Sequence, residues 1–155
     1  MVTDLTNRTL GANKARIVVA VGFLVAVALS IWLATPRIAI ASGSAFLIAQ
    51  LLDVSIFQRL RNQGWWKAPL VSSAIGSTVD TALFFSIAFA AQFAFLGYED
   101  GFALETASFL GVMAFETPRW ISWAFGDLFV KMAVAFALLL PYRAVSLVLL
   151  RQQPA

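Results

Sequence analysis

Long apolar runs separated by short polar breaks dominate the sequence. Four of them are long enough to cross a bilayer as helices, which takes about 20 residues; they cover residues 17–35, 38–57, 68–96 and 120–150. The third is longer than a perpendicular crossing needs and is expected to tilt. Pro141 is expected to kink the fourth, because proline cannot continue the helical hydrogen-bond ladder. The pattern predicts four transmembrane helices.

Residues 97–118, between the third and fourth runs, are less apolar and contain several acidic side chains. The stretch FALETASFLGVMAF within them is compatible with an amphipathic helix in the membrane interface or with a re-entrant segment. We expect the interfacial helix, on the extracytoplasmic side.

The composition fits this pattern. Of the 155 residues, 61% are hydrophobic and 12% are charged, and the mean hydropathy is +0.84. Soluble domains contain about 25% charged residues. The predicted fold class is all-α, a polytopic transmembrane helix bundle that forms a single transmembrane domain over residues 1–155.

Two residue types are missing, which limits the chemistry. The chain has no cysteine and no histidine, which excludes thiolate metal sites, thiol nucleophiles and the usual proton shuttle. It also lacks the GxxxxGK[ST] stretch of P-loop nucleotide hydrolases. We therefore expect no enzymatic activity, no metal site, no cofactor and no nucleic-acid partner.

The basic residues predict the orientation of the bundle. Eight of them flank one set of span ends, whereas two lie in the other connections beside acidic residues. Cytoplasmic connections are enriched in Lys and Arg, so both termini are expected in the cytoplasm and the protein in a bacterial inner membrane. The eight are Arg8, Lys14, Arg16, Arg59, Arg61, Lys67, Arg143 and Arg151, and the two are Arg37 and Arg119.

Asp80 stands inside the third apolar run. About eight large apolar side chains at roughly −0.3 to −0.6 kcal/mol each offset the cost of about 3 kcal/mol for one central aspartate. On a helix, Ser73, Gly76, Ser77, Asp80 and Phe84 share one face. The small residues alone are more often a helix-packing surface, but a carboxylate this costly usually marks a substrate or ion path. Asp80 is the main candidate functional residue.

The second run repeats the arrangement, with Phe46, Gln50 and Asp53 on one stripe. Asp53 is a candidate binding residue, or it snorkels to the headgroups beside Arg59. Both interpretations remain open from the sequence.

The fourth run contains Asp127 and Lys131, four residues apart. This spacing predicts an intrahelical ion pair inside the membrane. The pair either has a function or only neutralises two buried charges.

Several motifs in this chain combine into a specific resemblance. Residues 37–89 contain R-I-A-x-A-S, Q-x-x-D-x-x-x-F-x-x-L-R, W-W, A-P and D-T-x-x-F-F-x-I-A-F, and GDLFVKMAVAFALLLPY follows later. Over nearly all of its length the chain resembles the queuosine precursor transporters, also called the vitamin uptake transporter family. The residues at the motif positions are Arg37, Ser42, Gln50, Asp53, Phe57, Arg61, Trp65, Trp66, Ser73, Asp80, Thr81, Phe84, Phe85, Asp127, Lys131 and Pro141.

The resemblance implies import of 7-deazaguanine precursors of queuosine, such as 7-cyano-7-deazaguanine and its aminomethyl analogue. A deazaguanine presents a ring N–H and an exocyclic amine side by side, and one carboxylate can accept both in parallel hydrogen bonds. Asp80 is the first candidate acceptor and Asp53 the second. Further candidates are Gln50, Ser73 and Ser77 for the remaining polar edges, and Phe46 or Phe84 for stacking on the ring.

The family resembles a six-span bundle similar to vitamin-binding transporter subunits, whereas this chain has four strong spans. Its opening, TDLTNRTLG, resembles the family segment at the cytoplasmic end of the second span. We therefore expect two preceding crossings that are missing here through truncation or a misplaced start.

Two rival functions stay open. The protein could be a substrate-binding membrane subunit that needs a separate energising module, or a non-transporting scaffold whose buried charges lock the helices together. Uptake of labelled precursor separates transport from scaffolding, and a co-purifying ATPase would identify the energising module. A homo-oligomer is compatible with either.

Overall fold

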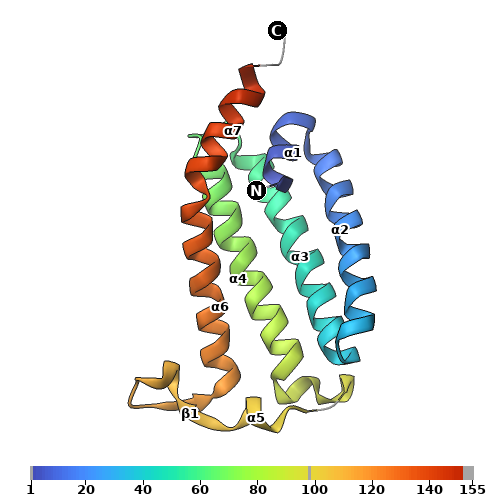
Figure 1. Cartoon of the computed structure of the whole chain (residues 1–155), viewed down its shortest axis with the longest axis vertical. Coiled ribbons are helices and arrows are strands. Elements are labelled where there is room, and N and C mark those ends of the chain that lie inside the picture. Colours follow the sequence, from blue (N-terminus) through green and yellow to red (C-terminus); the bar gives the residue numbers. More distant parts are fainter. Residues whose placement is uncertain (1, 98, 152–155) are drawn as a thin grey trace.

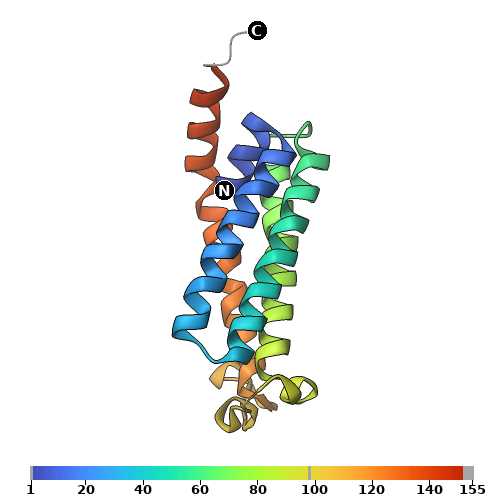
Figure 2. The ribbon, with the colours of Figure 1, turned by 90° about the vertical axis from the view of Figure 1, so that its right-hand side faces the viewer.

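The computed structural model describes residues 2–97 and 99–151. Four helical segments are long and apolar enough to span a membrane, and they stand side by side (Figures 1 and 2). The predicted all-α transmembrane bundle is confirmed. The segments are α2 (Ala12–Leu33), α3 (Pro36–Leu60), α4 (Lys67–Phe89) and the consecutive helices α6 (Arg119–Ala137) and α7 (Leu139–Arg151).

A short helix, α1 (Val2–Leu10), precedes the bundle and folds back beside α2 and α3. Gly11 separates α1 from α2 with φ +86°, a left-handed conformation that side chains other than glycine rarely adopt. Both α1 and α7 lie at the same end of the bundle, the upper end in Figure 1. The polar opening of the chain is therefore packed against the membrane helices.

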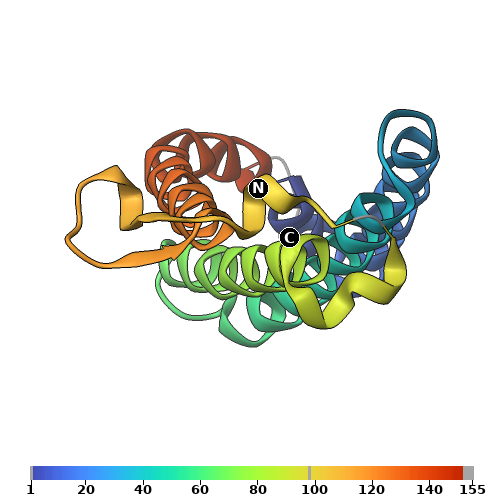
Figure 3. The same cartoon turned by 90° about the horizontal axis from the view of Figure 1, so that it is seen from below.

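Helix α3 lies between α2 and α4, and small residues on its two sides let both neighbours approach. Ala45 and Ala49 are fully or almost fully buried. A Cβ atom at Gly76 of α4 would lie 3.4 Å from the Ala49 carbonyl oxygen, and one at Gly43 would lie 3.4 Å from the ring of Phe23 in α2. The end-on view shows the resulting row, with α2 and α6 on opposite sides of α3 and α4 (Figure 3).

Arg37 fastens the first turn of α3 to the last turn of α4. Its side chain is 2% exposed, and its Nε and one terminal nitrogen donate to the carbonyl oxygens of Ile87 and Ala90 at 2.9 and 2.6 Å. The last carbonyls of a helix have no partner within the helix, so the guanidinium caps α4. The sequence placed Arg37 among the outer loop charges, but the structure buries it.

The third apolar run does not form one helix to residue 96. Helix α4 ends at Phe89, Ala90 is extended with ψ 140°, and a separate 3-10 helix, η1 (Ala91–Leu96), follows. The candidate membrane span is thus α4 itself, Lys67–Phe89, and Arg37 caps its end. The expected tilted helix over residues 68–96 is therefore wrong in its last seven residues.

The connection between α4 and α6 is not the interfacial helix that the sequence predicted. It forms an antiparallel hairpin in which Ser108 pairs with Glu116, and Leu110 and Gly111 turn the chain with φ +53° and +73°. This hairpin projects sideways beyond α6 (Figure 3). After η1, the connection contains α5 (Gly101–Leu104), β1 (Thr106–Ser108), η2 (Phe109–Gly111) and β2 (Glu116–Pro118).

The fourth span is broken at Leu138, between α6 and α7. Pro141 lies three residues later, and a proline ring displaces the carbonyl four residues before it, which here belongs to Ala137, the last residue of α6. The break therefore lies at the turn in which the ring of Pro141 disrupts the helical hydrogen bonds.

Candidate functional site

Asp80 and Lys131 form an ion pair between α4 and α6. The Lys131 Nζ donates to Asp80 Oδ2 at 2.7 Å and to Asp127 Oδ2 at 2.5 Å. The spacing of Asp127 and Lys131 predicted a pair on one helix, and the structure adds a second carboxylate from a neighbouring helix. One ammonium thus bridges two carboxylates.

Thr81 completes this charged network, which we define as Asp80, Thr81, Asp127 and Lys131. The Thr81 hydroxyl donates to Asp127 Oδ2 at 2.6 Å and accepts from Lys131 Nζ at 3.2 Å. Thr81 is 4% exposed. It was not among the predicted site residues, although its place directly after Asp80 in the D-T motif was a usable signal.

The three charged groups of the network do not sum to zero charge, and they are only partly buried. Two carboxylates face one ammonium, which leaves one negative charge when all three groups are ionised. The side chains of Asp80, Lys131 and Asp127 are 29%, 32% and 32% exposed. Charged groups at this depth are costly against lipid and usually face a polar path or a covering partner.

The predicted neighbours of Asp80 lie beside it along α4 without bonding to it. Ser73 and Ser77 are half-buried, and no hydrogen bond joins either to Asp80 among the described residues. Phe84 packs instead on Phe85, with ring centroids 5.1 Å apart. The structure therefore keeps these residues on one helix but gathers the polar contacts of Asp80 on α6.

Asp53 lies in a second polar region, where α1 covers α3 and α4. Asp53 is 6% exposed, and it interacts with Asp4 of α1 and Ser72 of α4. Arg59 is exposed, and no salt bridge joins it to Asp53 in the described chain. The snorkelling interpretation of Asp53 is therefore wrong, because α1 covers this carboxylate.

Two further residues of α1 contribute to this buried region. Asn7 is fully buried and its amide donates to the Val54 carbonyl oxygen at 3.0 Å. Thr3 donates to the side-chain oxygen of Gln50 at 3.4 Å. From the sequence, this opening segment was compared only with the family segment at the cytoplasmic end of the second span, although the three-residue spacing of Asp4 and Asn7 puts both on one helical face.

Phe46 is not part of either polar region. It packs towards α2, where a Cβ atom at Gly22 would lie 3.3 Å from its ring, and it contacts the core residues Ala15, Val19 and Val54. Its role here is packing between α2 and α3.

Gly76 lies between the two polar regions. A Cβ atom on it would be 3.7 Å from Asp53 Oδ1, and Asp80 follows one helical turn later on α4. The two carboxylates are thus on adjacent helices and separated by a glycine.

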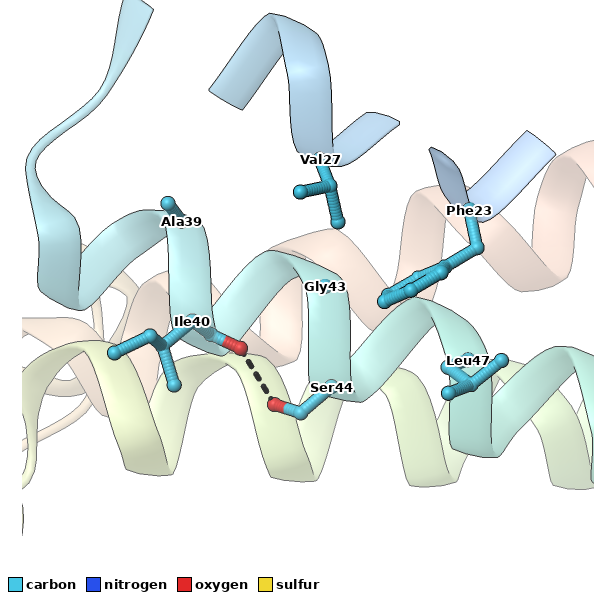
Figure 4. Close-up of a pocket in the computed structure, with 7 residues that line it drawn as sticks. All are labelled: Phe23, Val27, Ala39, Ile40, Gly43, Ser44 and Leu47. Atoms are coloured by element: carbon cyan, nitrogen blue, oxygen red, sulfur yellow. Dashed lines mark hydrogen bonds between the residues drawn. The ribbon is translucent and has the colours of Figure 1, made fainter. Parts of the chain in front are cut away.

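One hollow lies away from both polar regions. It is a groove of about 410 Å³ between α2 and α3, and the Ser44 hydroxyl within it is bonded to the Ile40 carbonyl oxygen at 2.7 Å. A smaller hollow of about 170 Å³ adjoins Thr81. Figure 4 shows the lining of the groove: Phe23, Val27, Ala39, Ile40, Gly43, Ser44 and Leu47. Its apolar lining offers nothing to orient a polar ligand, so the charged network is the better candidate site.

Among the described residues, no group of three or more acidic side chains could hold a metal ion.

Comparison with known proteins adds an independent observation. A family described as "Putative vitamin uptake transporter" matches residues 29–145. The "Probable queuosine precursor transporter" of Haemophilus influenzae is 32% identical over 174 aligned positions, which cover 98% of this chain and 66% of the relative. The "Queuosine precursor transporter" of Escherichia coli K12 is 30% identical over 176 positions, which cover 100% of this chain and 71% of the relative. The chain thus spans about two thirds of the length of these relatives. No solved structure matches the chain.

Proposed function

Because the chain belongs to the vitamin uptake transporter family, we propose that it imports 7-deazaguanine precursors of queuosine across the bacterial inner membrane. The proposed substrates are 7-cyano-7-deazaguanine and its aminomethyl analogue. Two relatives are named as queuosine precursor transporters, and the described chain has four helical segments long and apolar enough to span a membrane. In this proposal the protein is not an enzyme, and both termini lie in the cytoplasm.

The state of Asp80 is the observation on which the proposal mainly depends. Its Oδ2 accepts from Lys131 at 2.7 Å, and no described donor reaches Oδ1. The side chain is 29% exposed and lies near the middle of α4. A half-satisfied carboxylate at membrane depth can accept a further hydrogen bond from a ligand at little extra desolvation cost.

Deazaguanine chemistry fits such an acceptor. The ring N–H and the exocyclic amine point in the same direction and can donate to both oxygens of one carboxylate, which is the stronger, charge-assisted type of hydrogen bond. A ligand that lacks either donor would leave an oxygen unpaired in a water-poor site, which gives specificity. Asp80 is therefore the proposed acceptor, with Ser77 and Phe84 available one turn away on either side.

The charged network also allows Lys131 to release Asp80 while it keeps other partners. The ammonium holds Asp127 and Thr81 as well as Asp80, so a ligand that takes Asp80 leaves Lys131 with two partners. The exchange costs one ion-pair contact and keeps the ammonium paired, which suits a site that must bind and release.

A purely structural lock between α4 and α6 is the main alternative. The approximately one-third exposure of Asp80, Lys131 and Asp127 disfavours it, because a lock gains from exclusion of solvent. An energising partner is a separate question, and purification in mild detergent tests it directly, since a co-purifying ATPase would identify a binding subunit.

Uptake measurement tests the proposed function. In cells that can neither make nor import 7-cyano-7-deazaguanine, expression of this protein should restore accumulation of the labelled compound and of queuosine in tRNA. Unlabelled adenine at the same concentration serves as a competition control that should not reduce uptake. No accumulation above cells with an empty vector, with protein detected in the membrane, would contradict the proposal.

A further inference from the structure

A small hollow lies at the end of the bundle opposite α1, where the first turn of α3 meets the last turn of α4 (Figure 1). Its volume is about 290 Å³, close to the lower limit of about 300 Å³ for small-molecule sites. It is more enclosed than the groove between α2 and α3. The proposed orientation puts it on the extracytoplasmic face. Its lining consists of Thr35, Arg37, Ile38, Ala88, Phe89 and Asp100.

Arg37 brings an unsatisfied donor to this hollow. Its Nε and one terminal nitrogen cap α4, but the other terminal nitrogen, Nη1, is buried without a partner in the described chain. The residue as a whole is 2% exposed. Buried polar groups are almost always satisfied, so an exception needs an explanation. A ligand acceptor in the hollow would supply the missing partner.

The charge of Arg37 is also unbalanced. No carboxylate lies within ion-pair distance of its guanidinium in the part of the chain that the structure describes, although a buried charge is costly unless it is paired. Arg119, at the same end of the bundle, is 28% exposed and is nevertheless ion-paired with Glu105 at 2.7 Å and stacked on Phe102 at 4.0 Å. Capping of α4 therefore explains the position of Arg37 but leaves its charge unpaired.

Asp100 lines the same hollow and has an unused acceptor. Its Oδ1 accepts from the backbone N–H groups of Phe102 and Ala103 at 3.1 and 3.3 Å, which caps α5. No described donor reaches Oδ2, and no salt bridge joins Asp100 to Arg37 among the described residues. A cation and an anion thus lie on the wall of one hollow without contacting each other.

These groups match the polar edge of a guanine-type ring. That edge carries a carbonyl acceptor beside the ring N–H and the exocyclic amine. Arg37 can donate to the carbonyl, and Asp100 can accept from the two donors. Ile38, Ala88 and Phe89 add apolar walls, and protein pockets for single bases combine such edge contacts with stacking on aromatic and apolar side chains.

We propose that this hollow is a first binding site for the deazaguanine substrate on the extracytoplasmic face, from which the ligand passes to Asp80. The inference rests on the proposed transport function and adds a second site to it. Phe89 and Asp80 are nine residues apart on α4, which is roughly 13 Å at about 1.5 Å per residue. The two sites are therefore separate.

Aromatic side chains connect the hollow to the Asp80 region. The Phe89 ring lies 5.9 Å from that of Phe85 and 6.4 Å from that of Phe84, between ring centroids. Phe84 is one helical turn beyond Asp80 on α4. A flat ligand that leaves the hollow thus meets aromatic rings along α4 on the way to Asp80.

Asp100→Asn is the most selective change, because asparagine caps a helix as well as aspartate does. Its side-chain oxygen still has to accept from Phe102 and Ala103, so its NH2 turns towards the hollow and opposes the donors of the ligand. An Arg37 variant would also remove the cap of α4. The polar contact to the ligand is therefore tested at Asp100.

Right-side-out membrane vesicles that contain unlabelled 7-cyano-7-deazaguanine give the kinetics at the outer face, through exchange with the labelled compound outside. For Asp100→Asn we expect a KM at least fivefold above the wild type and a maximum rate within twofold of it. Glu99→Gln is the matched control, since it removes the same charge at an exposed neighbouring position that does not line the hollow. Its KM should stay within twofold of the wild type.

Equilibrium dialysis of the purified protein against labelled 7-cyano-7-deazaguanine counts the sites. We expect two bound molecules per chain for the wild type, one for Asp100→Asn, one for Asp80→Asn, and none for the double variant. Thermal unfolding of each variant in the same detergent shows that it is folded.

The outcomes separate this inference from the proposed function. One bound molecule per wild-type chain, or a KM of Asp100→Asn within twofold of the wild type, would overturn the inference and leave Arg37 as a cap of α4, with transport intact. An equal rise in KM for Glu99→Gln would assign the effect to charge in general and overturn it as well. Wild-type vesicles that contain the protein but show no exchange would contradict the proposed function itself.

Discussion

Asp80 and Asp53 are the same type of side chain on adjacent helices, yet their surroundings are opposite. Asp80 is 29% exposed and ion-paired with Lys131, whereas Asp53 is 6% exposed and has an oxygen without a donor in the described chain. The paired carboxylate is accessible and the unpaired one is enclosed. The difference indicates that pairing and access are separate properties: Asp80 is suited to exchange partners with a ligand, whereas Asp53 is enclosed between α1, α3 and α4.

Orientation in the membrane gives the sharpest test, because the result is all or none. The chain has no cysteine, so Gln63→Cys, after α3, and Glu99→Cys, after η1, can be labelled one at a time. Both positions are exposed. From the distribution of basic residues, we expect an impermeant maleimide to label position 99 in intact cells and position 63 only after permeabilisation. The reverse pattern would place the Asp53 region on the outer side and break the assignment of both termini to the cytoplasm.

The next largest effect is expected for Asp80→Asn. Asparagine keeps the shape but turns one acceptor into a donor that opposes the ligand, a loss of about 2–4 kcal/mol, or roughly 30- to 900-fold in uptake. Membrane insertion should be unchanged or improved. Thr78→Val is the matched control, since its hydroxyl bonds the Ala74 carbonyl oxygen of its own helix. Wild-type uptake by the Asn variant would return Asp80 to a structural role.

The charge count of the network predicts an order of stability. Lys131→Met leaves two carboxylates without a cation and should cost about 1–3 kcal/mol, less than a fully buried pair because the groups are partly exposed. Asp127→Asn leaves a neutral pair of Asp80 and Lys131 and should cost least, with the double variant between them. Thermal unfolding in detergent measures this order, with Lys67→Met as an exposed control. A double variant whose destabilisation equals the sum of the two single variants would mean that Asp127 and Lys131 do not interact.

The smallest effect is expected for Gly76→Ala, between the two regions. The added methyl would lie 3.4 Å from Asp53 Cβ, an ordinary contact distance, and alanine is favoured in a helix by up to about 1 kcal/mol. We expect a stability change within about 1 kcal/mol of zero and unchanged exchange activity. A large loss of exchange with normal stability would show that the two regions communicate through this contact.

The sequence predicted the parts of this protein that depend on local pattern. The four apolar runs became spanning helices, and the charged residues inside them became the polar regions. What it could not predict depended on contacts between distant segments. The partner of Asp80 is Lys131, 51 residues away, and nothing in the third run identifies it. The cover that α1 places over Asp53 is equally non-local.

The wrong expectations have the same origin. Residues 90–96 are apolar enough to continue α4, but the side chain of Arg37 takes the carbonyl oxygens that end it. In the following connection, the amphipathic pattern was overridden by two residues with positive φ, Leu110 and Gly111. In both places a single conformation or contact outweighed the average preference of the segment.

The hydrogen bonds between the Arg37 side chain and the end of α4 have a mechanical consequence. With two hydrogen bonds of 2.9 and 2.6 Å and 2% exposure, Arg37 pins α3 and α4 together at the end of the bundle opposite α1. At the other end a short connection joins α3, which ends at Leu60, to α4, which begins at Lys67, so the two helices are held together at both ends. A change in the spacing of α3 and α4 is therefore expected to be small at both ends of the pair. Arg37 thus does at one end of the α3–α4 pair, through two side-chain hydrogen bonds, what the connecting residues 61–66 do covalently at the other.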